Sequence, residues 1–310
     1  MKGLELSRRY YEEACRPVLK ERLGDKLDRL AVGLVGNGSE CYGFDDELSQ
    51  DHDFGPRFFV WLTDEDEQAI GGEVREALRA VPKSFLTYQG VNTSEHGAVG
   101  RQGVFRIGDY YRMMIGLDHV PTAMNEWRRL GEVNLSIATN GEVFADGPGE
   151  FTAFRDALKA GFPADLRLKK IAAACCAAAQ TGQYNYIRCL HRGEDVGAYI
   201  CQAQFMESAM RLIYLLNNAY RPFYKWLHRG LRELPILGRE SYDAARGLTR
   251  AADPDERVTR IEAFSAMIIE ELRRQGLTDS ASTFLLDHGP QVQARIKDPV
   301  LRAMPPFAEP

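Results

Sequence analysis

The fold is decided by one stretch of the chain, Gly36-Asn37-Gly38-Ser39-Glu40-Cys41-Tyr42-Gly43-Phe44-Asp45-Asp46-Glu47-Leu48-Ser49-Gln50-Asp51-His52-Asp53-Phe54. It begins with a turn of small residues and ends with two carboxylates on either side of one histidine. The apolar run before it predicts a strand near residues 29–36. The stretch therefore joins a strand, a glycine turn and a pair of acids.

Asp51 and Asp53 are the candidate metal ligands of this stretch. Residues two apart on a strand point to the same face, and two carboxylates on one face offer the hard oxygen ligands that Mg²⁺ prefers. His52 would face the opposite side, which favours a packing role over a catalytic one. An EF-hand is the alternative interpretation of an acidic loop. The segment lacks the ligand order and the glycine of an EF-hand, so this alternative is excluded.

Gly38 and Ser39 are the candidate phosphate-binding residues. A Gly-Ser pair at the start of a short helix offers backbone N–H groups, a hydroxyl and the positive end of the helix dipole. Such a pair taken alone is more often an ordinary turn or helix cap. Between two apolar strands and ahead of two acids, it predicts a site for a triphosphate and magnesium.

Composition is that of an ordinary soluble globular protein. The chain has 310 residues, 45% of them hydrophobic and 27% charged, which predicts two domains. A net charge of −5 argues against a protein that coats nucleic acid. The six cysteines form no C-x-x-C pair, and neither a signal peptide nor a membrane-spanning run is evident. We expect a cytoplasmic protein with reduced cysteines and no membrane partner.

The N-terminal half alternates between helices and strands. Ser7 is expected to cap a helix that runs through Leu19. After the turn, the pattern predicts strands over 58–62, 85–91 and 104–107, and a helix over 65–80 that begins at Thr63-Asp64. A small mixed sheet with helices against it is the natural product of this order.

The C-terminal half is predicted to be a helical bundle. Apolar stripes at helical spacing occur over 171–180, 195–219, 223–234 and 257–275. Gly147-Pro148-Gly149 is the strongest breaker between the halves. The predicted class is therefore α+β, with an α/β domain over 1–148 and a helical domain over 149–310.

Gly38-Ser39 followed by Asp51-His52-Asp53 resembles the signature of the DNA polymerase β-type nucleotidyltransferase superfamily, which includes aminoglycoside adenylyltransferases. The similarity is greater to a bacterial branch known mainly as a domain of unknown function. It extends over roughly 7–234, through Gly43-Phe44-Asp45-Asp46-Glu47-Leu48-Ser49, Gly55-Pro56-Arg57, Arg192-Gly193, Leu215-Leu216-Asn217, Tyr220 and Tyr224-Lys225-Trp226.

The resemblance implies a third acidic residue on a later strand, as a metal ligand or as a base. The candidate strand, Gly103-Val104-Phe105-Arg106-Ile107, contains no carboxylate. Asp109 just after it and Glu95 in the preceding loop are the substitutes, and Asp109 is taken as the third catalytic residue beside Asp51 and Asp53.

Three basic residues are further candidates for binding the nucleotide. In the adenylyltransferases, basic residues of the second domain reach the triphosphate, and Lys225 and Arg192 are candidates for that role here. Arg57 is a similar candidate in the first domain. The alternative for Lys225 is a side chain whose stem lies over Trp226 while its ammonium stays in water.

The resemblance implies a Mg²⁺-dependent nucleotidyltransferase that moves a nucleoside monophosphate, AMP from ATP in the first instance, to a hydroxyl group and releases pyrophosphate. The acceptor is either a small molecule or a protein side chain; nucleic acid is not expected. The alternative is a module of the same fold that binds nucleotide without turnover and acts in regulation or interaction. The oligomeric state is left open.

Overall fold

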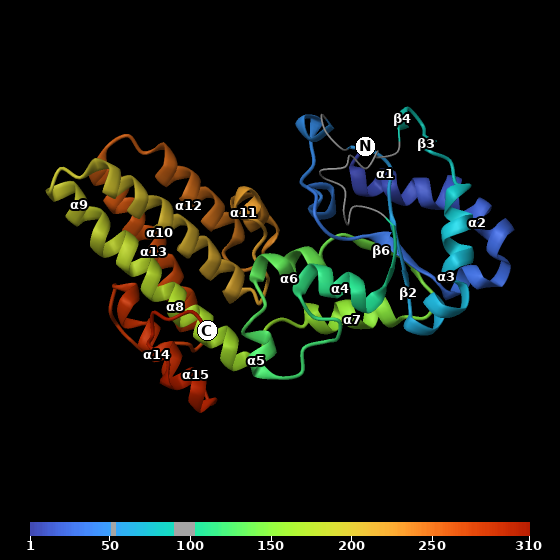
Figure 1. The fold of residues 1–310 in the computed structure, drawn as a ribbon. Coiled ribbons are helices and arrows are strands. Elements are labelled where there is room, and N and C mark those ends of the chain that lie inside the picture. Colours follow the sequence, from blue (N-terminus) through green and yellow to red (C-terminus); the bar gives the residue numbers. More distant parts are fainter. Residues whose placement is uncertain (51–53, 90–102) are drawn as a thin grey trace. The chain divides into compact units, whose positions relative to one another are not determined.

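The structure is a computed structural model, and it describes residues 1–50, 54–89 and 103–310. The chain forms two compact units, which Figure 1 draws in full. Unit 1 consists of residues 1–121 and 130–160, and unit 2 of residues 122–129 and 161–310. Unit 1 combines helices with strands, whereas unit 2 is helical. The predicted α+β class is confirmed.

Unit 1 is built around a four-stranded sheet of order β5-β2-β1-β6. Its strands are β1 (Ala31–Leu34), β2 (Phe59–Leu62), β5 (Gly103–Arg106) and β6 (Glu142–Asp146). β1 is antiparallel to β2 and β6, while β2 and β5 are parallel. The pairings Gly33↔Phe59 and Leu34↔Glu142 therefore place the C-terminal end of β1 beside the N-terminal ends of β2 and β6.

Helices cover both faces of this sheet (Figure 1). One face packs against α1 (Gly3–Arg9), α2 (Arg16–Leu23) and α3 (Asp64–Arg79), and the other against α4 (Ile107–Ile115), α6 (Glu132–Thr139) and α7 (Glu150–Lys159). Alternation along the strands explains this, because neighbouring residues point to opposite faces. Val60 lies in the core beneath α2 and α3. Its neighbour Trp61 stacks on Phe151 of α7, with ring centroids 3.8 Å apart.

The predicted strands over 29–36 and 58–62 are confirmed by β1 and β2, and Thr63 caps α3 by accepting the N–H of Asp66. The predicted helix cap at Ser7 is wrong. The helix begins at Gly3 and continues through a π-helical segment, η1 (Tyr10–Cys15), into α2. Ser7 is buried within α1, where its hydroxyl accepts the backbone N–H of Arg57 over 3.3 Å.

The long strand predicted over 85–91 is also wrong within the described residues. The chain forms a short hairpin there, of β3 (Ser84–Phe85) and β4 (Tyr88–Gln89). Leu86 has a positive φ of 53°, so the chain turns back before a longer strand can extend. Residues 90 and 91 lie outside the described part of the chain.

β6 is not among the predicted strands, and it moves the boundary between the units. Its residues pair with β1, and α7 after it packs Phe151 and Phe154 against the aromatic side chains of unit 1. Unit 1 therefore continues past the predicted boundary at residue 148, to residue 160. Residues 122–129, including α5 (Met124–Trp127), group with unit 2 instead.

Unit 2 is a bundle around α10 (Asp195–Leu216), which packs on α8 (Ala164–Ala178) and α13 (Pro254–Arg274). The predicted helices of this half are confirmed. The remaining elements are η5 (Ala179–Tyr186), α9 (Ile187–His191), α11 (Tyr224–Gly230), η6 (Leu231–Glu233), α12 (Gly238–Arg250), η7 (Leu285–Asp287), α14 (Gly289–Ala294) and α15 (Pro299–Ala303). Over the described residues, each helix is too short or too polar to cross a bilayer.

Candidate functional site

The glycine turn after β1 has a backbone that only glycine adopts readily. Gly36 has a φ of +128° and Gly38 a φ of +144°. Asn140 fixes the first of these residues with two hydrogen bonds of 2.9 Å, because its side chain accepts the N–H of Gly36 and donates to the Gly36 carbonyl. The hydroxyl of Tyr110 donates to the Val35 carbonyl over 2.7 Å. The turn is therefore held in place before any ligand arrives.

Ser39 begins a single turn of 3₁₀-helix, η3 (Glu40–Tyr42). Its carbonyl accepts the N–H groups of Tyr42 and Phe44, at 3.2 and 2.8 Å, while its hydroxyl does not cap this turn. The predicted short helix after Gly-Ser is thus present, but three residues give little helix dipole. Any phosphate binding here depends on local backbone N–H groups and on the serine hydroxyl.

Cys41, within the same 3₁₀ turn, is buried and does not act as a nucleophile. Burial raises the pKa of its thiol to about 12, so the thiol stays protonated at neutral pH. Its carbonyl accepts the N–H of Gly141 over 2.7 Å. The start of β6 therefore supports both ends of the turn, through Asn140 and Gly141.

A buried ion pair joins the turn to the segment that leads into β2. Arg57 and Glu40 are hydrogen-bonded to each other, and their side chains are only 5% and 13% exposed. The Glu40 carboxylate lies over Gly38, where a Cβ would come within 2.6 Å of Cδ of Glu40. Arg57 thus neutralises the acid nearest the turn, and it is bound by that acid rather than facing solvent.

Gly3 gives a second link between these two segments. A Cβ placed on Gly3 would meet Glu40 Cβ at 2.8 Å and the ring of Phe54 at 3.2 Å. Glu40 follows the Gly-Ser pair, and Phe54 directly follows Asp53. Glu40 and Phe54 therefore both pack against the start of α1, in a space that only glycine leaves open.

Asp45 has a structural role in the same region. It is 2% exposed, and its carboxylate accepts the backbone N–H of Gly3 over 2.8 Å. The ammonium of Lys2 lies 3.7 Å from its other oxygen. A carboxylate at the first N–H of a helix satisfies a donor that has no partner inside the helix. Asp45 therefore anchors α1 to the motif.

The predicted metal ligands Asp51 and Asp53 lie outside the described residues, as do His52 and Glu95. Within residues 1–50, 54–89 and 103–310, no three histidine, cysteine or acidic side chains gather closely enough to hold a metal ion. The magnesium site and the role of Glu95 stay predictions.

Asp109 is described, and the structure does not bring it to the glycine turn. It lies in the first turn of α4, after the C-terminal end of β5. The glycine turn lies at the opposite ends of the strands, beside the N-terminal end of β2. β2 and β5 are parallel and four residues long, so about 10 Å or more of strand separates the two positions. Asp109 is therefore not part of the proposed site.

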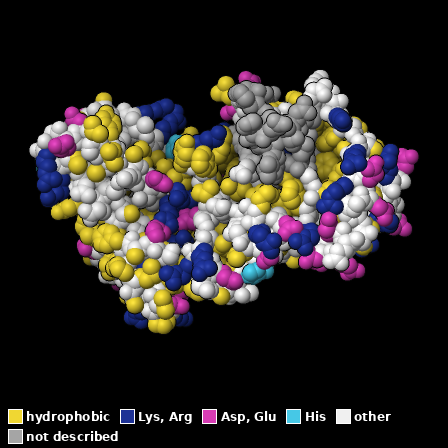
Figure 2. Space-filling view, viewed as in Figure 1, with side chains coloured by type: hydrophobic (Ala, Val, Ile, Leu, Met, Phe, Trp, Pro, Cys, Tyr) yellow, Lys and Arg dark blue, Asp and Glu magenta, His cyan; other side chains and the backbone are white. Residues whose placement is uncertain are grey.

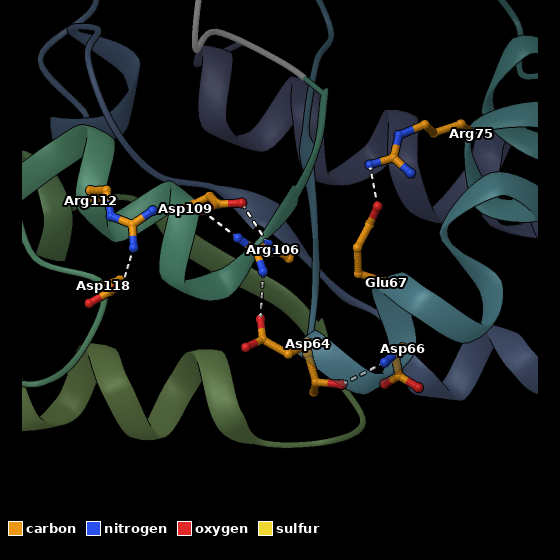
Figure 3. Close-up of polar contacts among 9 residues, drawn as sticks. Asp64, Asp66, Glu67, Arg75, Arg106, Asp109, Arg112 and Asp118 are labelled. Atoms are coloured by element: carbon orange, nitrogen blue, oxygen red, sulfur yellow. Dashed lines mark hydrogen bonds and ion pairs between the residues drawn. The ribbon is translucent and has the colours of Figure 1, made fainter.

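The surroundings of Asp109 also disfavour a role as general base. Arg106 donates two hydrogen bonds to it, of 2.7 and 2.9 Å, and Arg112 donates a third of 3.2 Å (Figure 3). The bonds from Arg106 hold the pKa of this carboxyl below its usual value. A general base works best with a pKa near the operating pH, so a depressed pKa is unsuitable.

Asp109 instead lines a cavity of about 680 Å³ at the C-terminal edge of β2 and β5. The charged side chains of the cavity neutralise one another, because Arg106 lies 3.7 Å from Asp64 and Arg112 pairs with Asp118 (Figure 3). Asp118 is also hydrogen-bonded to His119 over 2.9 Å. These groups are exposed, so solvent screens their pairing and the pairs contribute little to stability. We assign the cluster to the surface of unit 1.

Arg192 and Lys225 belong to unit 2. Arg192 is exposed at the end of α9, where its backbone N–H donates to the Cys189 carbonyl over 3.1 Å. Lys225 is exposed on α11, with its ammonium 5.0 Å from the ring centroid of Trp226. The stacking on Trp226 agrees with the alternative stated for Lys225. Their roles in binding a nucleotide remain predictions.

Replacing Gly38 with alanine should damage the turn. The φ of +144° is unfavourable for alanine, and the new methyl group would displace the Glu40 carboxylate. We expect Gly38→Ala to weaken Mg²⁺-ATP binding by about tenfold or more, through misplacement of the turn. Gly43→Ala is the matched control, because Gly43 also has a positive φ, of +68°, but faces open space. Equal ATP affinity in the two variants would contradict a ligand at Gly38.

Comparison with known proteins gave few matches. Residues 127–227 match a family described as a domain of unknown function (DUF4037). No curated protein matches the chain. A solved structure of a nucleotidyltransferase-like protein from Exiguobacterium sibiricum 255-15 is 12% identical, with a TM-score of 0.36, and the alignment covers 86% of this chain and 77% of that one. The family match begins after the glycine turn, so the turn is interpreted from its own geometry.

Proposed function

We propose that this protein is a Mg²⁺-dependent nucleotidyltransferase that transfers AMP from ATP, or another nucleoside monophosphate from its triphosphate, to a hydroxyl acceptor. The observation that carries the proposal is the buried pair of Arg57 and Glu40. It holds the Gly38-Ser39 turn against the segment that follows Asp51-His52-Asp53. A buried ion pair that fastens the glycine turn to the segment before β2 gives the turn the fixed geometry that a binding site needs.

Each part of the motif has a role in this proposal. Backbone N–H groups near Gly38 and the hydroxyl of Ser39 bind phosphate oxygens. Asp51 and Asp53 hold Mg²⁺, which when bound neutralises charge on the phosphates. The fit is supported by the positive φ of Gly38, which shapes the turn, and by Arg57, which offsets the charge of the Glu40 carboxylate that lies over Gly38.

The chemical step is a substitution at the α-phosphorus. The acceptor oxygen forms a bond to that phosphorus, the bond from phosphorus to the oxygen bridging the α- and β-phosphates breaks, and pyrophosphate leaves. The proton of the hydroxyl passes to a base. Asp109 lies at the far ends of the strands from the glycine turn. Glu95 is therefore the remaining candidate for this base among those that the sequence offered. The acceptor is a small hydroxylated molecule or a protein side chain.

One observation favours a second candidate function, a module that binds nucleotide without turnover. β5 carries no carboxylate, and Asp109, the nearest acid after it, lies at the C-terminal ends of β2 and β5, away from the glycine turn. Without a third acid, a site of this kind would bind Mg²⁺-ATP but lack part of the charge needed in the transition state.

The deciding experiment incubates the purified chain with Mg²⁺ and ATP labelled at the α-phosphate, alone and with a panel of hydroxylated small molecules and acceptor proteins. The proposal predicts pyrophosphate release and a labelled acceptor, both abolished by EDTA. Metal-dependent ATP binding without release for any acceptor would favour the second function. If the chain does not bind ATP with or without Mg²⁺, both functions are wrong.

A further inference from the structure

A dense group of aromatic and basic side chains lies on and beside α11 and α12 of unit 2. The predicted nucleotide-binding role of Lys225 leaves the other members of the group unexplained. In Figure 2, hydrophobic and basic side chains lie next to one another in the region where Figure 1 draws these helices. We call this surface the aromatic–basic patch and define it by the residues Phe223, Tyr224, Lys225, Trp226, Arg232 and Tyr242.

A ring contact joins the two helices of the patch. Tyr224 and His228 are one helical turn apart on α11 and share a face. His228 stacks on Tyr242 of α12, with ring centroids 4.0 Å apart and planes 15° from parallel. Arg232, from η6 between the helices, lies 5.5 Å from the Tyr242 ring centroid. The His228–Tyr242 stack therefore links α11 to α12, with the Arg232 cation beside it.

Two of the aromatic side chains are unusually exposed. Phe223 is 45% exposed and Tyr224 is 71% exposed, and their rings contact each other with centroids 4.3 Å apart. Folding gains little from a tyrosine that remains mostly in water, since the hydrophobic contribution is proportional to the area buried. Exposed rings beside cations are suited to stacking against a flat, negatively charged ligand.

The local charge has the opposite sign to that of the whole chain. Residues 221–250 contain seven basic and three acidic side chains, a balance of +4, although the net charge of the chain is −5. The basic residues are Arg221, Lys225, Arg229, Arg232, Arg239, Arg246 and Arg250, and the acidic ones are Glu233, Glu240 and Asp243. The net charge of the whole chain argued against nucleic acid, but it hides the positive balance of residues 221–250.

We propose that the aromatic–basic patch binds single-stranded RNA. Unpaired bases would stack on Phe223 and Tyr224, and backbone phosphates would bind Lys225 and Arg232. A duplex hides the faces of its bases, so it could not use the exposed rings. Its denser phosphate charge would also meet the three acids that lie among the cations. We propose RNA rather than DNA as the single-stranded ligand, because RNA loops and ends present unpaired bases, whereas DNA is mostly paired.

This inference does not depend on the proposed nucleotidyltransfer, because the patch is separate from Gly38, Ser39, Asp51 and Asp53. It gives Lys225 a role in binding RNA instead of its predicted role at the nucleotide. A variant with Asp51→Ala and Asp53→Ala should bind RNA as the unmodified chain does. Loss of RNA binding in that variant would place the RNA at the nucleotide site and overturn the inference.

The test is a fluorescence anisotropy titration of the full chain into a labelled single-stranded RNA of about 16 nucleotides. Titrations at about 50 mM and 200 mM salt give the slope of log affinity against log salt. We expect Tyr224→Ala to weaken binding by about tenfold with the slope unchanged, because it removes stacking only. Lys225→Gln combined with Arg232→Gln should reduce the slope by about 1.4, from about 0.7 for each lost phosphate contact.

The matched control is Tyr184→Ala with Arg188→Gln, which removes a similar contact elsewhere in unit 2. Arg188 lies 4.8 Å from the Tyr184 ring centroid, and Tyr184 is 43% exposed. The control should bind RNA like the unmodified chain. Three results would overturn the inference: no RNA binding at low salt, equal weakening in the control, or binding to anionic phosphatidylserine vesicles that needs the patch while RNA binding does not.

Discussion

Changing both Asp51 and Asp53 to alanine is expected to abolish Mg²⁺-dependent nucleotide chemistry while the chain still folds. The proposal assigns both metal-binding carboxylates to these residues, and metal ions contribute several kcal/mol to charge stabilisation in such reactions. At about 1.4 kcal/mol for each tenfold, pyrophosphate release should fall by about 10³-fold or more. ATP binding should lose its dependence on Mg²⁺, as measured by titration with a fluorescent ATP analogue.

Glu47→Ala is the control for this prediction, because Glu47 is an exposed acid from the same stretch of sequence. It should keep both the magnesium dependence and the rate of pyrophosphate release. A double variant that still binds ATP only with Mg²⁺ would remove Asp51 and Asp53 from the site. A Glu47 variant with the same loss as the double variant would show that general negative charge matters, rather than two specific ligands.

Arg57→Ala should be the most destabilising single change in the motif. Arg57 is 4% exposed, and its removal leaves the Glu40 carboxylate buried without its partner. Loss of one member of a buried pair typically costs about 3–5 kcal/mol. We expect the free energy of unfolding of unit 1 to fall by about that amount, in urea titrations that follow the fluorescence of Trp61.

Trp61 is fully buried in unit 1, while Trp127 and Trp226 belong to unit 2. Measurements in a background with phenylalanine at those two positions therefore report on unit 1. Arg79→Ala is the control, since Arg79 pairs with Glu76 at the surface, with side chains 78% and 66% exposed. It should change stability by no more than about 0.5 kcal/mol. Weaker ATP binding at unchanged stability in Arg57→Ala would instead make Arg57 a phosphate ligand.

The strands at the centre of unit 1 could be predicted because their residues are apolar on both faces. β1 and β2 are buried along their whole length, so each appears in the sequence as an uninterrupted apolar run between turn residues. β6 has neither feature. Its residues, Glu142-Val143-Phe144-Ala145-Asp146, are half-buried at the edge of the sheet and begin and end with acids. The preceding Asn140-Gly141 was the available turn signal.

The site was predicted less completely than the fold, because its geometry depends on strand directions. Asp109 follows a predicted strand, as a third acid should. Only the parallel pairing of β2 and β5 shows that it lies at the ends of the strands opposite the glycine turn. Asn140 and Asp45 were missed as supports of the turn and of α1. Their partners are backbone groups about 100 and 40 residues away in the sequence, which no local pattern reveals.

The central claim is that the stretch from Gly36 to Phe54 holds a metal–nucleotide complex. The most direct measurement replaces Mg²⁺ with Fe²⁺ in the presence of ATP and generates hydroxyl radicals with ascorbate and peroxide, so that the backbone is cut close to the metal. Mass spectrometry of the fragments then locates the cuts. We expect ATP-dependent cleavage within residues 36–54, suppressed by excess Mg²⁺. Cleavage within residues 106–119 instead, beside Asp109 and Asp118, would contradict it.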